Sequence, residues 1–286
     1  MTAGIRLSEA GAEVFVPDGG DVKSALARTT HLGIGAHQDD LEIMAYHGIL
    51  QCFGFDGRWF TGVAVTNGRG SARDLAYRDF TDGQMIDARK REQKKAATVG
   101  EYSAVVLMNH ESARIKDASD EAVAADLDEL FSVVAPEVVY THNLADKHDT
   151  HVAVALRVIA ALRRLPPHAR PRSLIGCEVW RDLDWLCDRD KVVMPVDTRP
   201  NLADALLGIF DSQIAGGKRY DLAARGRRLA NATFFESHEV DQRQAIIFGM
   251  DLTSLLTDAD ADPLALVETH IERFADEVRE RVRRLK

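Results

Sequence analysis

The stretch His31-Leu-Gly-Ile-Gly-Ala-His-Gln-Asp-Asp-Leu-Glu42 joins an apolar run to a cluster of reactive side chains. Residues 32–36 have the composition of a short strand that is buried on both faces, as the strands of parallel sheets are. The reactive groups follow the strand directly: His37, Asp39, Asp40 and Glu42. We therefore expect them at the carboxyl end of a strand, which is where open α/β sheets bind their ligands.

A second cluster, Asp-Lys-His-Asp-Thr-His at residues 146–151, also follows an apolar run, at residues 136–142. His148 and His151 are three positions apart, so they point to one side if a helix begins there. Two imidazoles and a carboxylate are the usual protein ligands of a catalytic zinc ion, which keeps a fourth position for water. A histidine near aspartates is usually a surface charge group, but two such clusters together favour a metal site.

The composition is that of a soluble globular enzyme, with 45% hydrophobic and 28% charged residues. The net charge of −9 argues against a dedicated nucleic-acid surface. Three cysteines without a Cys-x-x-Cys pair indicate neither a disulfide framework nor a four-cysteine zinc site. Neither a signal segment nor an apolar run of about eighteen residues occurs, so we expect a cytoplasmic protein without a membrane span.

Strand and helix patterns alternate along the chain, which predicts an α/β fold with a mainly parallel sheet in a three-layer sandwich. The expected strands are residues 12–17 at an edge, 32–36, 60–66, 104–108, 138–141, 175–180 and 192–196. We interpret residues 1–286 as one domain. Its parts are a lead-in (1–30), a core with the metal motifs (31–165), and a region of sheet extension, cap and C-terminal helices (166–286).

The expected helices are residues 21–26, 41–53, 87–100, 123–134 and 152–165, with a mainly helical chain from residue 200 onward. The basic residues of 87–100 are interpreted as a solvated face. The last helix carries the most regular apolar stripe: Val267, Ile271, Phe274, Val278, Val282 and Leu285. Either the core or a second subunit, in a homo-oligomer, would bury that stripe.

The two clusters together predict one metal ion whose ligands and catalytic groups are different residues. If His37, Asp40 and His151 bind the ion, Asp39 remains free to take a proton from the metal's water. His148, one turn from a ligand, is then placed to donate, in its protonated form, to the oxyanion that forms when a carbonyl is attacked. Zinc is the expected ion, although other divalent metals accept the same ligands.

Other motifs are weaker. The polar loop 66–73 could bind substrate through Arg69 and Arg73, and a solvated loop explains it equally well. His110, at another strand end, is interpreted as structural more readily than as a pocket residue. Gly33-Ile-Gly35 resembles the start of a dinucleotide-binding turn, but Gln38 stands at the third glycine position and acids occupy the phosphate site. A Gly-x-Ser-x-Gly elbow is absent from the sequence.

The joint pattern resembles the PIG-L or LmbE-like deacetylases, whose hallmarks are an A-H-P-D-D-E-like loop and a later H-P-D-H-like motif. The corresponding segments are Ala36–Glu42 and His148–His151, within a resemblance that covers residues 31–240. The similarity extends to a T-D-G-like turn that contains Asn67 and to an R-x-x-E helix with Arg89 and Glu92.

The resemblance implies a Rossmann-like fold and zinc-dependent hydrolysis of an N-acetyl group on a small amino sugar or its conjugate. It makes His37, Asp40 and His151 the zinc ligands and Asp39 the general base. His148 is then the residue that stabilises the oxyanion or protonates the product. Asp146 corresponds to an acid that orients an imidazole, and Glu236 with His238 falls near a region that borders the pocket.

Two departures from the family pattern stand out: Gln38 replaces a proline, and Asp149-Thr150 replaces Pro-Asp. The first loosens the loop backbone, and the second leaves open how His148 is held. N-deacetylation is the leading hypothesis. The alternatives are hydrolysis of another bond such as a phosphoester, favoured by Arg69 and Arg73, and a metal-binding protein that has lost catalysis.

Overall fold

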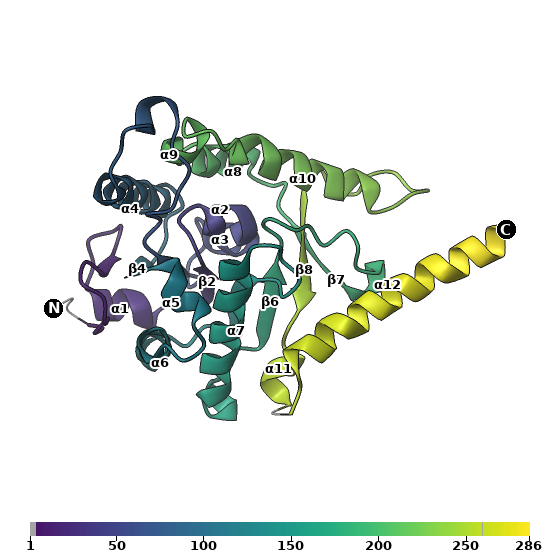
Figure 1. Cartoon of the computed structure of the whole chain (residues 1–286), viewed down its shortest axis with the longest axis horizontal. Coiled ribbons are helices and arrows are strands. Elements are labelled where there is room, and N and C mark those ends of the chain that lie inside the picture. Colours follow the sequence, from purple (N-terminus) through teal and green to yellow (C-terminus); the bar gives the residue numbers. More distant parts are fainter. Residues whose placement is uncertain (1–3, 259) are drawn as a thin grey trace.

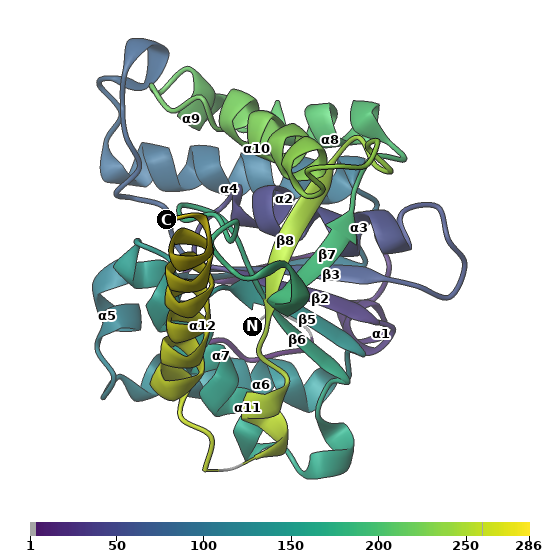
Figure 2. The same ribbon diagram turned by 90° about the vertical axis from the view of Figure 1, so that its right-hand side faces the viewer.

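A computed structural model describes residues 4–258 and 260–286, which fold around one eight-stranded sheet (Figures 1 and 2). The strand order is β1-β4-β3-β2-β5-β6-β8-β7. The strands are β1 (Glu13–Phe15), β2 (His31–Gly35), β3 (Phe60–Thr66), β4 (Ala104–His110), β5 (Val138–His142), β6 (Ser173–Cys177), β7 (Lys191–Pro195) and β8 (Ile246–Asp251). The α/β class expected from the sequence is confirmed.

The central strands β4, β3, β2, β5 and β6 run parallel to one another. They are apolar and buried because helices cover both of their faces. The outer strands differ: β1 pairs antiparallel with β4, and β8 pairs antiparallel with both β6 and β7. The expectation of a mainly parallel sheet was therefore too strong. Strand β8 was also missed, because residues 200–286 were expected to be helical.

Helices form a layer on each face of the sheet. On one face α1 (Val22–Ala27), α5 (Ser112–Lys116), α6 (Glu121–Val133), α7 (Asp149–Arg164) and α11 (Ser254–Thr257) enclose one apolar core. On the other face α2 (Asp40–Met44), α3 (Tyr46–Cys52), α4 (Asp82–Val99) and α8 (Pro200–Leu207) enclose a second. Helices α9 (Asp211–Ile214) and α10 (Tyr220–Phe234) extend that layer, as Figure 1 shows along its upper edge.

Most helix boundaries agree with the sequence patterns, and three expectations need correction. The helix expected over 41–53 is divided at Ala45 into α2 and α3. Helix α4 begins at Asp82, where Thr81 and Gln84 form a capping box. Its basic residues are not all solvated, since Arg89 is only 1% exposed. Short 3-10 turns occur at Leu75–Tyr77, Pro167–Ala169 and Asp188–Asp190.

The last helix, α12 (Pro263–Leu285), leaves the body of the molecule toward the C-terminus (Figure 1). Only its first half packs on the core, through Val267 and His270. Within the described ranges, none of the helices combines the length and the apolar composition needed to cross a bilayer. Cys52, Cys177 and Cys187 are free and buried, as small apolar residues would be.

Candidate metal centre

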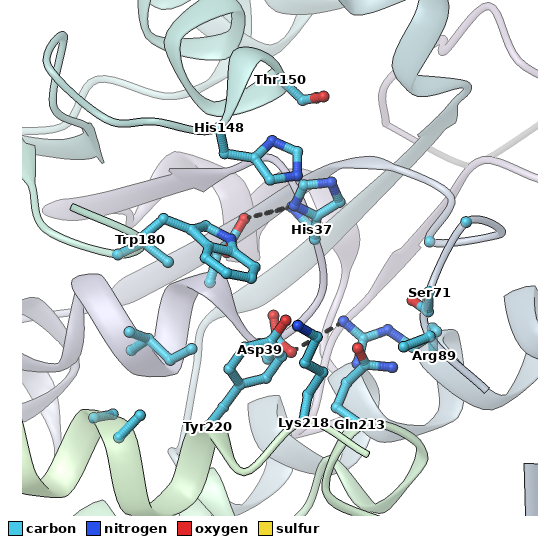
Figure 3. Close-up of a pocket in the computed structure, with 18 of the residues that line it drawn as sticks. His37, Asp39, Ser71, Arg89, His148, Thr150, Trp180, Gln213, Lys218 and Tyr220 are labelled. Atoms are coloured by element: carbon cyan, nitrogen blue, oxygen red, sulfur yellow. Dashed lines mark hydrogen bonds and ion pairs between the residues drawn. The ribbon is translucent and has the colours of Figure 1, made fainter. Parts of the chain in front are cut away.

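The two sequence clusters meet because β2 and β5 are adjacent parallel strands. His31 lies opposite Val138 and Gly33 opposite Tyr140. The loops that leave the carboxyl ends of these strands therefore emerge at the same edge of the sheet, one leading to α2 and the other to α7. Figure 3 shows His37 and His148 facing each other there.

Three potential ligand atoms form a nearly equilateral triangle. The Nδ1 atom of His37 lies 3.2 Å from Nε2 of His151, and Oδ2 of Asp40 lies 3.3 Å and 3.5 Å from these two nitrogens. An ion bound tetrahedrally at about 2.0–2.2 Å from each ligand separates the ligand atoms by about 3.3–3.6 Å. The triangle therefore has the size that a zinc-like ion requires.

Supporting contacts hold the triangle. The backbone N–H of His37 donates to Oδ2 of Asp40 at 2.6 Å. Although burial opposes it, the imidazoles of His151 and His142 hold the pKa of Asp40 well below its usual value, so this carboxylate is ionised. Behind His151, a carboxylate oxygen of Asp146 lies 3.5 Å from its Nδ1 atom. Asp146 thus lies where an acid that orients an imidazole is expected.

His142 was missed as a site residue, although it ends β5 as His37 follows β2. Its ring stacks on His151 with centroids 3.8 Å apart, and its Nε2 lies 3.4 Å from Oδ2 of Asp40. A second possible ligand group is therefore Asp40, His142 and His151. However, Nε2 of His142 already accepts the backbone N–H of Ala36 at 2.8 Å, which occupies its lone pair.

Asp39 lies beside the triangle in a strained backbone conformation, with φ of 87°. Such an angle is rare for residues other than glycine and is found where a structure fixes a functional side chain. A carboxylate oxygen of Asp39 lies 3.2 Å from an Nη2 atom of the buried Arg89 (Figure 3). Burial raises the pKa of Asp39 to about 6, and the charge of Arg89 opposes that rise.

Gln38, the first departure from the family pattern, is buried and bridges two loops. The side-chain amide of Gln38 donates to the backbone carbonyl of Thr66 at 2.9 Å. The backbone carbonyl of Gln38 accepts a hydrogen bond from the guanidinium of Arg89. Gly68 packs against the side chain of Gln38. The φ angle of Gly68 is +72°, and a Cβ atom at this position would lie 2.5 Å from Oε1 of Gln38, so only glycine fits. The amide therefore provides a contact between the loops that proline would lack.

His148, in the second departure, packs among the other imidazoles. Its ring lies 4.5 Å from that of His151 and 5.1 Å from that of His37. Its backbone N–H donates to Asp146 at 2.9 Å, so Asp146 holds both motif histidines, while Asp149 is exposed. Burial lowers the pKa of His148, which favours the neutral ring in place of the protonated form expected from the sequence.

A cavity of about 580 Å³ opens over the triangle. Trp180 and Tyr220 form an aromatic wall, with ring centroids 6.1 Å apart, and Trp180 lies 6.0 Å from His148. The backbone N–H of Trp180 donates at 3.1 Å to Asp146, the acid behind His151, which connects the wall to the metal site. These lining residues come from the region 166–286, so both parts of the chain complete the cavity.

Other sequence candidates do not line the cavity. Arg73 and Arg69 form ion pairs with Asp82, and Arg69 also pairs with Glu111. His110 is buried against Asp126 at 2.8 Å, which is the structural role expected for it.

The remaining candidates are also structural or exposed. Asn67 is buried and accepts the backbone N–H of Arg69 at 3.1 Å, while Glu236 and His238 are exposed beyond α10. Glu42 faces away from the ion triangle, into the core, where Tyr102 and Gln93 each donate to it at 2.7 Å. None of these side chains adds to the cavity wall.

A sequence model of the PIG-L family, described as GlcNAc-PI de-N-acetylase, matches residues 32–162. The chain therefore contains a PIG-L domain, which spans residues 32–162. The matched segment contains both metal motifs, Arg89 and β2 to α7, and it ends before the aromatic wall of the cavity. A comparison with curated proteins finds no match.

Solved structures share the fold of this chain at low sequence identity. N,N'-diacetylchitobiose deacetylase from Pyrococcus horikoshii matches with a TM-score of 0.60 and 14% identity, over 81% of this chain and 86% of that one. The pseudoaglycone deacetylase Dbv21 gives 0.55 and 15%, over 78% and 97%. GalB, a 4-carboxy-2-hydroxymuconate hydratase from Pseudomonas putida KT2440, gives 0.55 and 16%, over 78% and 95%. Because a hydratase is among them, the shared fold alone does not fix the reaction.

Proposed function

We propose that the chain is a metal-dependent N-deacetylase that acts on an N-acetylated amino sugar or a related small amide. In this proposal His37, Asp40 and His151 hold the ion, which is zinc. The triangle of ligand atoms, with sides of 3.2, 3.3 and 3.5 Å, carries the proposal, since its edges suit tetrahedral zinc. The PIG-L domain, whose family model is described as a de-N-acetylase, supports it.

When bound, the ion supplies Lewis acidity, which makes water more acidic and polarises an amide carbonyl. Asp39 is the base that accepts the proton of the attacking water. It suits the task because Arg89 fixes its carboxylate and because its pKa, raised by burial to about 6, is close to neutral pH. The contact with Arg89 directs this second carboxylate away from the ligand triangle.

His148 lies on the opposite side of His37 from Asp39, at the cavity wall (Figure 3). In the proposal it donates a hydrogen bond to the oxyanion, while Asp39 returns the proton that it took from the water to the leaving amine as the C–N bond breaks. A neutral imidazole carries one N–H, so the lowered pKa of His148 is compatible with its role as a donor. Asp146 fixes its backbone at 2.9 Å and thereby keeps the ring in place.

The cavity suits a substrate about the size of a sugar conjugate, because small-molecule sites usually enclose roughly 300–1,000 Å³. Trp180 and Tyr220 offer flat apolar surface for the face of a ring. Arg69 and Arg73 no longer favour the phosphoester alternative, since acids outside the cavity engage both of them.

The test is acetate release from N-acetylglucosamine and a panel of its conjugates, by zinc-loaded and chelator-treated protein. Asp39→Asn should be inactive, whereas Asp149→Asn, which changes an exposed acid of the second motif, should remain active. Activity that survives chelation, or phosphate release in place of acetate, would refute the proposal. Full metal binding without turnover of any amide would favour the non-catalytic alternative.

A further inference from the structure

The ionisable groups of the cavity leave an excess of positive charge. Its two acids are both engaged: Asp40 belongs to the ligand triangle and Asp39 pairs with Arg89. The other charged side chains that line it are basic, namely Lys116, Lys218 and Arg227. None of these three forms an ion pair with any described residue, although the whole chain has a net charge of −9.

Lys218 is the best placed of the three. Its backbone N–H donates to the carbonyl of Gln213 at 2.8 Å, and its carbonyl accepts the N–H of Tyr220 at 2.7 Å. Gly217, with φ of +100°, allows the turn before it. The ammonium lies 5.2 Å from the ring of Trp180, and Figure 3 shows it pointing into the cavity beside Asp39 and Arg89. An unpaired cation held in this way attracts an anion to the aromatic wall.

We propose that the substrate carries an anionic group, a carboxylate or a phosphate, and that Lys218 binds it. Lys116 on α5 and Arg227 on α10 add positive charge from other sides of the cavity. The inference rests on the proposed function for the position of the amide over the metal centre. If Lys218 binds an anion, a neutral sugar amide should bind more weakly than a negatively charged sugar amide of the same size.

The test is calorimetric binding to zinc-loaded Asp39→Asn, in which turnover is blocked. The probes are N-acetylglucosamine, its 6-phosphate and N-acetylmuramic acid, which compare no charge, a phosphate and a carboxylate. At least one anionic probe should bind about tenfold more tightly than the neutral sugar. Adding Lys218→Gln should remove most of that preference and its salt dependence, whereas Lys23→Gln on α1 should leave both unchanged.

Equal binding of all three probes, no binding of any, or a preference that survives Lys218→Gln would overturn the inference. The outcome is separable from that of the proposed function. If the wild-type protein releases no acetate from any probe but still prefers an anion through Lys218, the deacetylase proposal fails and the anion site stands.

An independent observation concerns α12, whose apolar stripe is uncovered beyond Val267. The exposed fractions are 47% for Ile271, 41% for Phe274, 40% for Val278, 59% for Val282 and 77% for Leu285. Leu264, Val267, Ile271, Phe274 and Val278 repeat at the three-and-four spacing of a coiled coil, and Leu285 resumes it after Arg281. The core therefore does not bury this stripe.

Acidic and basic residues are also distributed unevenly along α12. Residues 263–277 contain four acidic residues and one basic residue, while 278–286 contain five basic residues and one acidic residue. A parallel pair would place like charges together, whereas an antiparallel pair places each acidic half against a basic half. We propose that α12 pairs antiparallel with α12 of a second copy of this chain.

Light scattering coupled to size exclusion should give a dimer, and Ile271→Glu with Val278→Glu should give a monomer. Ile271→Cys protein mixed with Leu285→Cys protein should form a mixed disulfide dimer, and neither should crosslink to itself efficiently. A wild-type monomer, or self-crosslinking of Ile271→Cys, would refute the antiparallel pair. Monomers that bind vesicles of anionic phospholipid through α12 would instead show that a membrane covers the stripe.

Discussion

Nδ1 of His37 lies 3.2 Å from Nε2 of His151, although 114 positions separate the two residues. Parallel pairing of β2 with β5 brings them together, and Asp40 completes the triangle. Two nitrogens this close are best stabilised by a proton or a cation between them. The contact therefore connects the topology of the sheet to the proposed metal chemistry.

Asp39→Asn should retain zinc and lose turnover. The amide keeps the size of the side chain and lies outside the ligand triangle, but it cannot accept the proton of water. We expect kcat for acetate release to fall by roughly a hundredfold or more. Zinc content by mass spectrometry and kcat, measured on the same preparation, check this. An unchanged kcat would remove Asp39 from the mechanism.

The pH profile should depend on Asp39 and its partner Arg89. The base must be ionised, burial raises its pKa to about 6, and a bound cation opposes that rise. We therefore expect kcat/KM to increase with pH, with a midpoint at or below about pH 6. Loss of the Arg89 charge in Arg89→Met should raise the pKa of Asp39 and move the midpoint upward. Arg91→Met, which changes an exposed neighbour, should leave it in place.

Glu42 should make the folded state less stable as pH rises. Burial raises the pKa of Glu42 from 4.5 to about 7, so the folded chain retains a proton that the unfolded chain releases. Stability should fall between pH 4.5 and pH 7 by about 3 kcal/mol from this group, and level off above pH 7.

Urea unfolding of metal-free protein at pH 5 and pH 8 tests the effect of Glu42. In Glu42→Gln the free energies of unfolding at pH 5 and pH 8 should be nearly equal, because the substitution removes the titrating carboxyl group. Glu239→Gln, on an exposed loop, should leave the difference as it is. A wild-type protein with equal stability at both pH values, or an unchanged slope in Glu42→Gln, would contradict the prediction.

Periodicity predicted the five central strands and the two loops that carry the motifs, because a strand buried on both faces is a continuous apolar run. It failed for β8, which lies between β6 and β7 and follows a long helical region. The role of Arg89 was hidden because basic residues on a helix are usually solvated. Trp180 and Lys218 reach the cavity only through the placement of residues 166–286, which spacing along the chain does not encode.

His37 and His142 allow the two possible ligand sets to be separated, because each belongs to only one of them. His142 accepts the N–H of Ala36, so we expect His142→Ala to keep zinc and to lose some stability, since that buried N–H is left unpaired. Equilibrium dialysis with zinc and thermal unfolding measure the two effects. Loss of zinc from His142→Ala with retention in His37→Ala would assign the ion to Asp40, His142 and His151 instead.

The most direct test of the central claim is zinc stoichiometry after chelation and reconstitution, for wild-type protein and His151→Ala. Removal of this buried imidazole leaves two ligand atoms of the triangle, too few for a tight structural or catalytic zinc site. We expect one zinc ion per wild-type chain and almost none in His151→Ala protein that remains folded by circular dichroism. Full occupancy in His151→Ala, or no binding by the wild-type protein, would contradict this expectation.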